Sequence, residues 1–310
     1  MLDLEARANA LCAGPAGCGF LLTIEESALP VEVAARPEIA IEAAAKTLLE
    51  MPPWMHNHNL TIATVLAEGP RLYGFAVSLL SVPEAAWLFA PLDRSAQLWI
   101  SEDGNPPDPA KLLSRSAGPA VWERYSQQPR NYSRGSKHMA FVTSTAVDGS
   151  SSLLAGRAYE AIEWPLPQPV QQFRLVVSPA ARVFEVDGPE AWHRLCVAYP
   201  ATPYERPPMP EGHVGWSPYP GAGPPLGLDD RLVPDWSAVA HDWDAVHLPL
   251  GGLLTSDQVR VDSSAGWTEL WGWGAEQTVW LRWCFTAAER MPALAALPEP
   301  VLDHRPRWVR

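Results

Sequence analysis

Proline is the feature that most restricts how this chain can fold, because 33 of its 310 residues are proline. A proline inside a helix removes a backbone hydrogen bond and clashes with the preceding turn, so this many prolines divide the chain into short elements and long loops. They disfavour a helical bundle. Candidate strands and scattered helices follow one another without regular βαβ alternation. This order predicts an α+β fold of mainly antiparallel short strands in one or two packed sheets, with a few helices and long Pro-rich loops.

Short apolar runs bounded by turn residues mark the expected strands. They cover residues 19–25, 60–66, 71–80, 172–177, 181–186, 245–250 and 277–285, and a further strand that starts at Met139 and ends in hydroxyl residues. Prolines and acidic residues in a first turn mark the expected helices. These cover residues 38–51, 119–126 and 189–199, together with a short helix after Pro234.

Composition along the chain predicts three parts. Residues 1–66 form an N-terminal extension or subdomain, and their first 19 residues, rich in Gly and Pro, are expected to be loosely ordered. Residues 67–290 form the main α+β domain, with a Pro/Gly-rich insertion near 200–230 that shows no periodicity. Residues 291–310 form a basic tail.

The net charge of −12 would repel a phosphate backbone, which argues against nonspecific nucleic-acid binding. The four cysteines form no CxxC pair and no disulfide framework, so a reducing compartment fits best. No apolar run is long enough to span a bilayer, and the first residues lack a basic signal-peptide region. We therefore expect a soluble cytoplasmic protein without a membrane partner. Most of its 15 tryptophans are expected in the core and at its rim.

Common catalytic motifs are missing from usable contexts. The sequence has no GxGxxG, GxxxxGK[ST], HExxH, GxSxG or paired CxxC motif, which removes most support for dinucleotide-binding, P-loop, zincin and hydrolase functions. A looser pattern of four segments remains. It consists of Arg71-Leu-Tyr-Gly, Phe141-Val-Thr-Ser-Thr, Trp243-Asp-Ala-Val-His and Ala275-Glu-Gln-Thr-Val-Trp.

In this order the four segments resemble the bacterial ADP-ribosyltransferases, over roughly residues 68–285. That superfamily places an Arg or His on a first strand, a Thr-Ser or Ser-Thr-Ser strand end next, and a glutamate last. The long gap between Thr145 and Glu276 departs from its compact members. The resemblance implies an enzyme that uses NAD as its substrate, cleaves the nicotinamide–ribose bond and transfers ADP-ribose. The acceptor would be a protein, a nucleic acid or a small molecule.

Four residues become catalytic candidates through this resemblance. Cleavage of the bond develops positive charge on the ribose, which a nearby carboxylate stabilises. Glu276 is the first candidate for that carboxylate and Asp244 the second. Thr143 and Ser144 are expected to hydrogen-bond the nicotinamide ribose or to orient the glutamate.

Four further residues become candidates for NAD binding. Arg71 would hold a phosphate through two parallel hydrogen bonds. Tyr73 or Trp243 would stack on nicotinamide, and His247 completes the predicted binding set. No resident metal is predicted.

Each candidate also has an ordinary structural interpretation: Glu276 as a solvated charge before a strand, and Arg71 as a surface residue. Two other function classes stay open. One is a non-catalytic acidic interaction or immunity-type protein that covers a basic partner. The other is a hydrolase with a carboxylate/His metal site formed by Asp242, Asp244 and His247, residue types that suit several divalent ions. These three residues can equally cap a helix and support neighbouring backbone.

Overall fold

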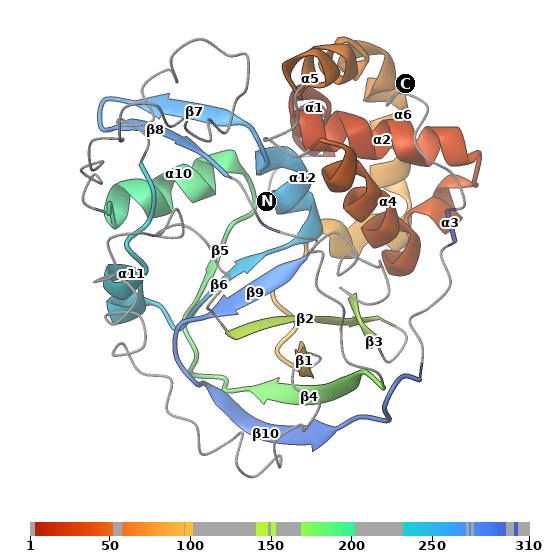
Figure 1. The fold of residues 1–310 in the computed structure, drawn as a ribbon. Helices are drawn as coiled ribbons and strands as arrows, with labels where there is room; N and C mark the ends of the chain where they lie inside the picture. The colour runs from red at the N-terminus through yellow and green to blue at the C-terminus, as the bar shows by residue number, and fades with distance from the viewer. Residues whose placement is uncertain are drawn as a thin grey trace, which may run out of the picture.

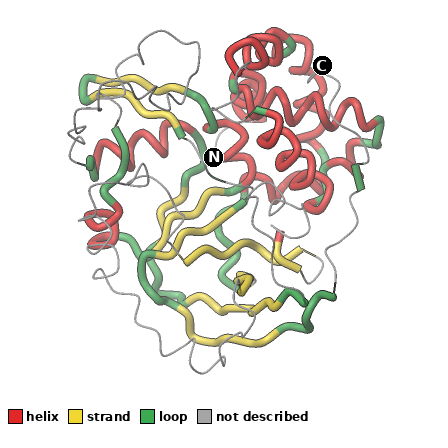
Figure 2. The backbone as a smooth tube through the Cα atoms, in the orientation of Figure 1, coloured by secondary structure: helices red, strands yellow, loops and turns green. Residues whose placement is uncertain are grey.

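Helices at the N-terminal end pack against one side of a curled sheet in the computed structural model (Figures 1 and 2). The structure describes residues 4–51, 58–95, 97–101, 141–147, 150–152, 169–201, 232–270, 273, 276–295 and 301–302. The predicted helix at 119–126 and nearly all of the predicted 200–230 insertion lie outside these residues. Of the predicted basic tail, only 291–295 and 301–302 are described.

The described residues between 4 and 89 are mainly helical. Their elements are α1 (Leu4–Ala13), α2 (Pro15–Ser27), α3 (Val31–Ala34), α4 (Pro37–Glu50), α5 (His58–Ala67), α6 (Gly69–Ser81) and the 3-10 helix η1 (Pro83–Phe89). The predicted helix at 38–51 is confirmed as α4. The predicted strands at 19–25, 60–66 and 71–80 are wrong, since these residues lie in α2, α5 and α6. The expectation of a loosely ordered start is also wrong, because α1 begins at Leu4.

The role of proline explains these errors except the one at 60–66, since α5 has no proline. Helices α2, α4, α6, η1 and α10 (Pro189–Ala198) all carry a proline in their first turn. There the missing N–H costs nothing and the fixed φ favours the helix, so these prolines begin helices rather than interrupt them. Short apolar runs do not distinguish a buried helix from a buried strand by periodicity alone.

The strands form one large sheet and one hairpin. They are β1 (Gln97–Ser101), β2 (Phe141–Val147), β3 (Ser150–Ser151), β4 (Gln171–Val177), β5 (Val183–Glu185), β6 (Ala245–Leu248), β7 (Arg260–Ser263), β8 (Gly266–Glu269), β9 (Gln277–Trp280) and β10 (Phe285–Arg290). The large sheet has the order β10-β4-β1-β2-β9-β6-β5, with β3 on β2, while β7 and β8 pair separately. Among the described pairs only β5–β6 is parallel. The predicted α+β class with mainly antiparallel strands is therefore confirmed, although the sheet is mixed.

Three predicted strands are shorter than expected, and the strand predicted at 181–186 is β5, which covers only Val183–Glu185. The strand at 245–250 ends at Leu248, because Pro249 caps helix α12 (Leu250–Ser256). The strand at 277–285 is two strands, β9 and β10, separated by residues 281–284. The predicted helix after Pro234 is confirmed as α11 (Trp236–Asp242), whose N-terminus is capped by Asp235.

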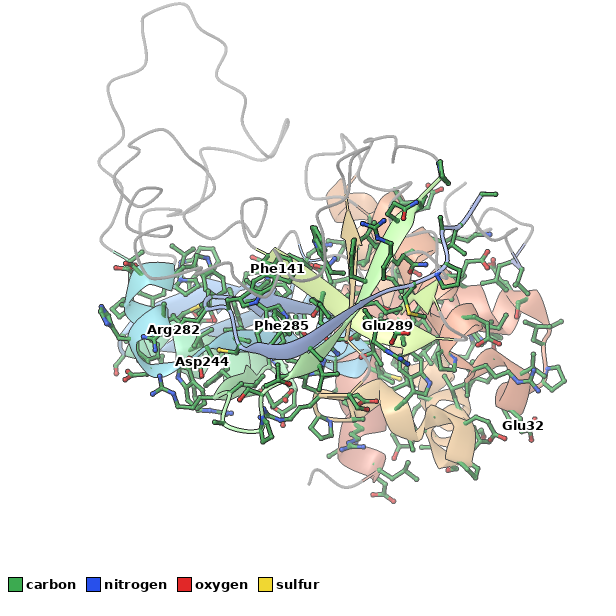
Figure 3. The ribbon with its side chains drawn as sticks, turned by 90° about the horizontal axis from the view of Figure 1, so that it is seen from below. Glu32, Phe141, Asp244, Arg282, Phe285 and Glu289 are labelled. Atoms are coloured by element: carbon green, nitrogen blue, oxygen red, sulfur yellow. The ribbon has the colours of Figure 1, made fainter. Side chains whose placement is uncertain are left out.

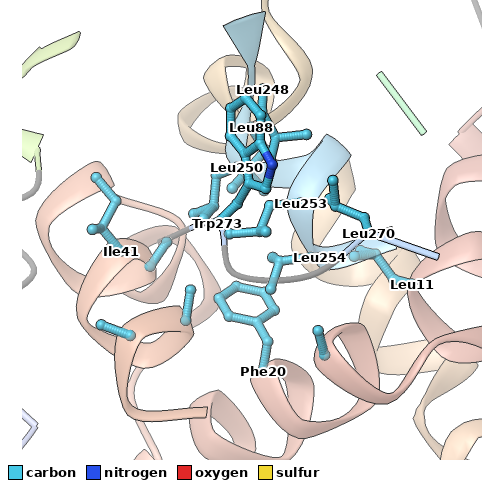
Figure 4. Packing of buried hydrophobic residues seen from close by; sticks show 14 of the residues in the cluster. Leu11, Phe20, Ile41, Leu88, Leu248, Leu250, Leu253, Leu254, Leu270 and Trp273 are labelled. Carbon is cyan, nitrogen blue, oxygen red and sulfur yellow. The ribbon is translucent and has the colours of Figure 1, made fainter. Parts of the chain in front are cut away.

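The two faces of the sheet contact different apolar clusters. Val246 and Val279 point toward the helices and join the larger core, whereas the neighbouring Ala245 and Trp280 join a smaller aromatic cluster on the opposite face. Figure 4 shows α12 within the larger core, with side chains of Leu253 and Leu254 beside residues of α1 and α2. The helices thus share one core with the sheet, and the division at residue 66 stays a prediction.

No single helix among the described residues is long and apolar enough to cross a membrane. Helices α6 and η1 meet the length and composition criterion only as a pair, and they are bent by 102° relative to each other.

Candidate functional site

Three adjacent strands place polar residues in one row across the sheet, and two of these residues, Glu185 and His247, are ionisable. In the pairing register Glu185 of β5 lies opposite His247 of β6, and His247 lies opposite Thr278 of β9. Side chains of directly opposite residues share a face of a sheet. Since alternate residues of a strand also share a face, this row lies on the same side as Ala245 and Trp280, away from the helices.

His247 is held between two carboxylates. Its Nδ1 lies 2.5 Å from Oε2 of Glu185, and its Nε2 lies 3.2 Å from Oε1 of Glu276. The imidazole is 2% exposed. A neutral imidazole carries one N–H, whereas the charged ring carries two. Because an ionised carboxylate only accepts, the arrangement satisfies both ring nitrogens only when His247 is an imidazolium.

Glu276 accepts four hydrogen bonds from three parts of the chain. Its Oε2 accepts from the backbone N–H of Thr145 at 2.8 Å and from the hydroxyl of Ser152 at 2.9 Å. Its Oε1 accepts from the hydroxyl of Thr145 at 2.9 Å and from His247. The residue is only 4% exposed. It is therefore a buried, oriented carboxylate and not the solvated charge of the ordinary interpretation.

His247, Glu185 and Glu276 form a cluster in which the positive ring and the negative carboxylates stabilise one another's charge. Burial opposes the charged ring of His247, but the hydrogen bonds and charges of Glu185 and Glu276 outweigh it and raise the pKa of His247 to about 9. Burial likewise acts to raise the pKa of Glu276, yet His247, Thr145 and Ser152 outweigh it and the pKa is lowered. At neutral pH the cluster is therefore an imidazolium between two carboxylates.

Thr143 and Ser144, the predicted hydroxyls, are buried near Glu276 but have other partners. The hydroxyl of Thr143 donates to Oε1 of Gln97 at 2.5 Å and accepts from the indole of Trp280 at 2.8 Å. The hydroxyl of Ser144 lies 2.6 Å from that of Ser151. Of the strand-end residues 143–145, Thr145 is the one whose hydroxyl bonds Glu276.

Arg71 and Tyr73 are not part of this cluster. Both lie on α6, where the Arg71 guanidinium makes 2.7 Å hydrogen bonds to both carboxylate oxygens of Glu25 and one to Glu68. Tyr73 packs against the larger core. The predicted strand that was to carry these residues is a helix, so the structure does not bring them to Glu276.

Asp244 belongs to a separate ion-pair group and directly precedes strand β6. Its carboxylate accepts from the backbone N–H of Arg182 at 2.8 Å and lies 3.6 Å from Nη1 of Arg282. Figure 3 shows Asp244 and Arg282 close together. With these partners Asp244 supports local backbone and does not contact Glu276 through any hydrogen bond described here.

Trp243 and the three residues of the alternative metal site hydrogen-bond different partners. The indole of Trp243 donates to the hydroxyl of Tyr199, which donates to Asp242 at 2.8 Å. Asp242, Asp244 and His247 therefore have three different sets of partners. Within the described ranges no three His, Cys, Asp or Glu side chains are placed to hold a metal ion, so the predicted carboxylate/His metal site does not form there.

Sequence reasoning missed three members of the site: Glu185, Thr145 as a partner of Glu276, and Ser152. Glu185 stands at the end of the run Val-Phe-Glu in a predicted strand, where a charged residue is a weak signal of a polar partner. Thr145 directly follows the two predicted hydroxyls, Thr143 and Ser144. Nothing in the sequence pairs Glu185 with His247, or Thr145 and Ser152 with Glu276, because these pairings depend on strand order and register.

Comparison of the chain with protein-family models, curated proteins and solved structures finds no match. The assignment of a function therefore depends on the residues and geometry described above.

Proposed function

We propose that this protein is an ADP-ribosyltransferase-like enzyme that cleaves the nicotinamide–ribose bond of NAD and transfers ADP-ribose to an acceptor. One observation carries the proposal. Glu276 is an oriented, ionised carboxylate that hydrogen-bonds His247 and the hydroxyl of Thr145 in β2, which is 131 residues away in the sequence. These are residue types that the resemblance to ADP-ribosyltransferases associates with one site.

The proposed chemistry uses the negative charge of Glu276. When the C1′–N bond of NAD breaks, its electron pair leaves with nicotinamide and the ribose becomes positively charged. A carboxylate held beside the ribose lowers the energy of that state. The acceptor then forms a bond to C1′ and gives up its proton. Thr145 fixes the direction of the Glu276 oxygens through its backbone N–H and its hydroxyl, so little reorganisation is needed during the reaction.

Access to Glu276 sets a condition on substrate binding. Because the residue is 4% exposed and has four donors, a ribose hydroxyl must replace one of them. The hydroxyl of Ser152 is the simplest one to replace, since it contributes a single hydrogen bond to Oε2. The proposal includes no phosphate contact from Arg71, whose guanidinium keeps its partners on the helices.

The test is nicotinamide release and NAD-induced thermal shift for the wild type and for Glu276→Gln. A matched control is Glu289→Gln, which changes an exposed glutamate that pairs with Arg174 on the neighbouring strand. We expect loss of about 100-fold or more in release for Glu276→Gln, as for removal of other electrostatic groups that stabilise a transition state. The control should match the wild type, and circular dichroism should show that both variants are folded. Release at the wild-type rate by folded Glu276→Gln would contradict the assignment.

A second candidate is a non-catalytic acidic protein that binds a basic partner. The complete set of donors around buried Glu276 favours it, because a purely structural ion-pair cluster has the same appearance. The net charge of −12 would steer such a partner toward the protein. Absence of both thermal shift and release at millimolar NAD, with co-purification of one basic protein, would select this function.

A further inference from the structure

Glu185 is the most exposed of the three ionisable residues Glu185, His247 and Glu276. Its side chain is 34% exposed, whereas those of His247 and Glu276 are 2% and 5% exposed. Oε2 of Glu185 accepts from Nδ1 of His247 at 2.5 Å, and Oε1 accepts from the backbone N–H of Leu92 at 3.1 Å. Its carboxylate is therefore fixed at both oxygens.

The charge of His247 depends on a small number of neighbours. The ionisable groups that act on it are Glu185 from β5 and Glu276 from the segment before β9. Strand β2 contributes Thr145, which bonds Glu276 and carries no charge. Glu276 divides its acceptor capacity among four donors and lies farther from the ring, at 3.2 Å. Glu185 makes the shorter contact with the ring, at 2.5 Å.

Loss of the Glu185 charge has a defined structural consequence. In Glu185→Gln the new amide N–H₂ can donate to Nδ1, while the amide oxygen still accepts from Leu92. The ring then keeps a single proton on Nε2, which still donates to Glu276. All of these hydrogen bonds persist with a neutral ring, so His247 loses its proton at a lower pH, and Glu276 then loses the opposite charge beside it.

We infer that Glu185 is the positioning residue of this site: it orients His247 through Nδ1 and keeps the ring charged, so that Glu276 stays anionic. The effect on turnover rests on the proposed function, whereas the effect on the ring does not. Glu185 acts through His247 and is given no contact with the substrate.

The test is the NMR titration of the imidazole of His247 between pH 5 and 10 in protein with isotope-labelled histidine. The signal among the eight histidines is assigned by its loss in His247→Gln. In the wild type the ring should stay charged through pH 8. In Glu185→Gln its titration should move down by about 1–3 pH units, the effect of one adjacent opposite charge. The matched control Glu190→Gln, at an exposed position on α10, should leave the titration unchanged.

Three outcomes separate this inference from the proposed function. An unchanged titration in folded Glu185→Gln overturns the inference whatever the activity. A shifted titration without nicotinamide release by the wild type supports the role of Glu185 and overturns the proposed function. If the titration shifts and the wild type releases nicotinamide, kcat for release by Glu185→Gln should fall on the alkaline side at a lower pH than in the wild type. That lower pH should match the shifted titration of His247. Should Glu185→Gln fail to fold, a wild-type His247 that loses its charge near pH 6.5 would overturn the inference.

Discussion

The buried imidazolium of His247 predicts a stability that falls as pH rises from 6.5 through 9. The pKa of His247 is raised from 6.5 to about 9 in the folded protein, so the native state holds a proton that the unfolded state releases first. The stabilisation is complete below pH 6.5, the ordinary value, and is lost as pH rises through about 9. Alkaline conditions should therefore weaken the fold well before lysines lose their charge.

The size of the effect follows from the pKa change. Each unit corresponds to about 1.4 kcal/mol, so a rise from 6.5 to about 9 represents about 3 kcal/mol of folding free energy. Solvent around Glu185, which is 34% exposed, weakens its share of the interaction and lowers the expected value to about 2–3 kcal/mol. A small domain has a total stability of roughly 5–15 kcal/mol, so the loss should be easy to measure.

The assay is urea unfolding followed by tryptophan fluorescence at pH 6, 7, 8 and 9, for the wild type and His247→Gln. The stability advantage of the wild type should shrink by about 2–3 kcal/mol across this range. Burial raises the pKa of the Cys18 thiol to about 12 and that of Cys284 to about 11, so both proteins also lose stability above pH 9, and this loss cancels in the comparison. His241→Gln, at an exposed position, is the matched control. A difference between wild type and His247→Gln that stays constant from pH 6 to 9 would refute the reasoning.

Two further predictions concern packing and capping, and both are measured by urea unfolding. Gly252→Ala should cost about 1–3 kcal/mol or more, because its Cβ would lie 2.1 Å from the carbonyl oxygen of Val186, whereas Gly74→Ala in α6 has open space and should stabilise by about 0.5–1 kcal/mol. Equal changes in unfolding free energy for the two variants would show that the contact with Val186 does not destabilise Gly252→Ala. Asp235→Ala should cost about 1 kcal/mol, since Oδ1 of Asp235 accepts from two backbone N–H groups in the first turn of α11; an unchanged midpoint would exclude the cap as a stabilising feature.

Sequence patterns predicted the elements whose signals are local. The helix after Pro37 combines a first-turn proline, an acidic residue and a run of alanines, and the structure has α4 there. The predicted strand that contains the hydroxyl run is β2, which continues through Val147 beyond those hydroxyls. Residues 60–66 and 71–80 were misassigned because their apolar runs fit either a strand or a helix. Burial among the other N-terminal helices selected the helix, and the sequence does not show that burial.

For the candidate site, the sequence alone selected Glu276 and His247 by residue type and chain order. Only the tertiary structure showed that Glu185, Thr145 and Ser152 are their partners. It also showed that Arg71 belongs to a separate group of charges on the helices. The physical reason is that residue type is a local property, whereas a hydrogen bond between strands depends on their order and register. A carboxylate, an imidazole and a hydroxyl far apart in the chain become one ionised cluster only when the sheet aligns them and burial removes competing water.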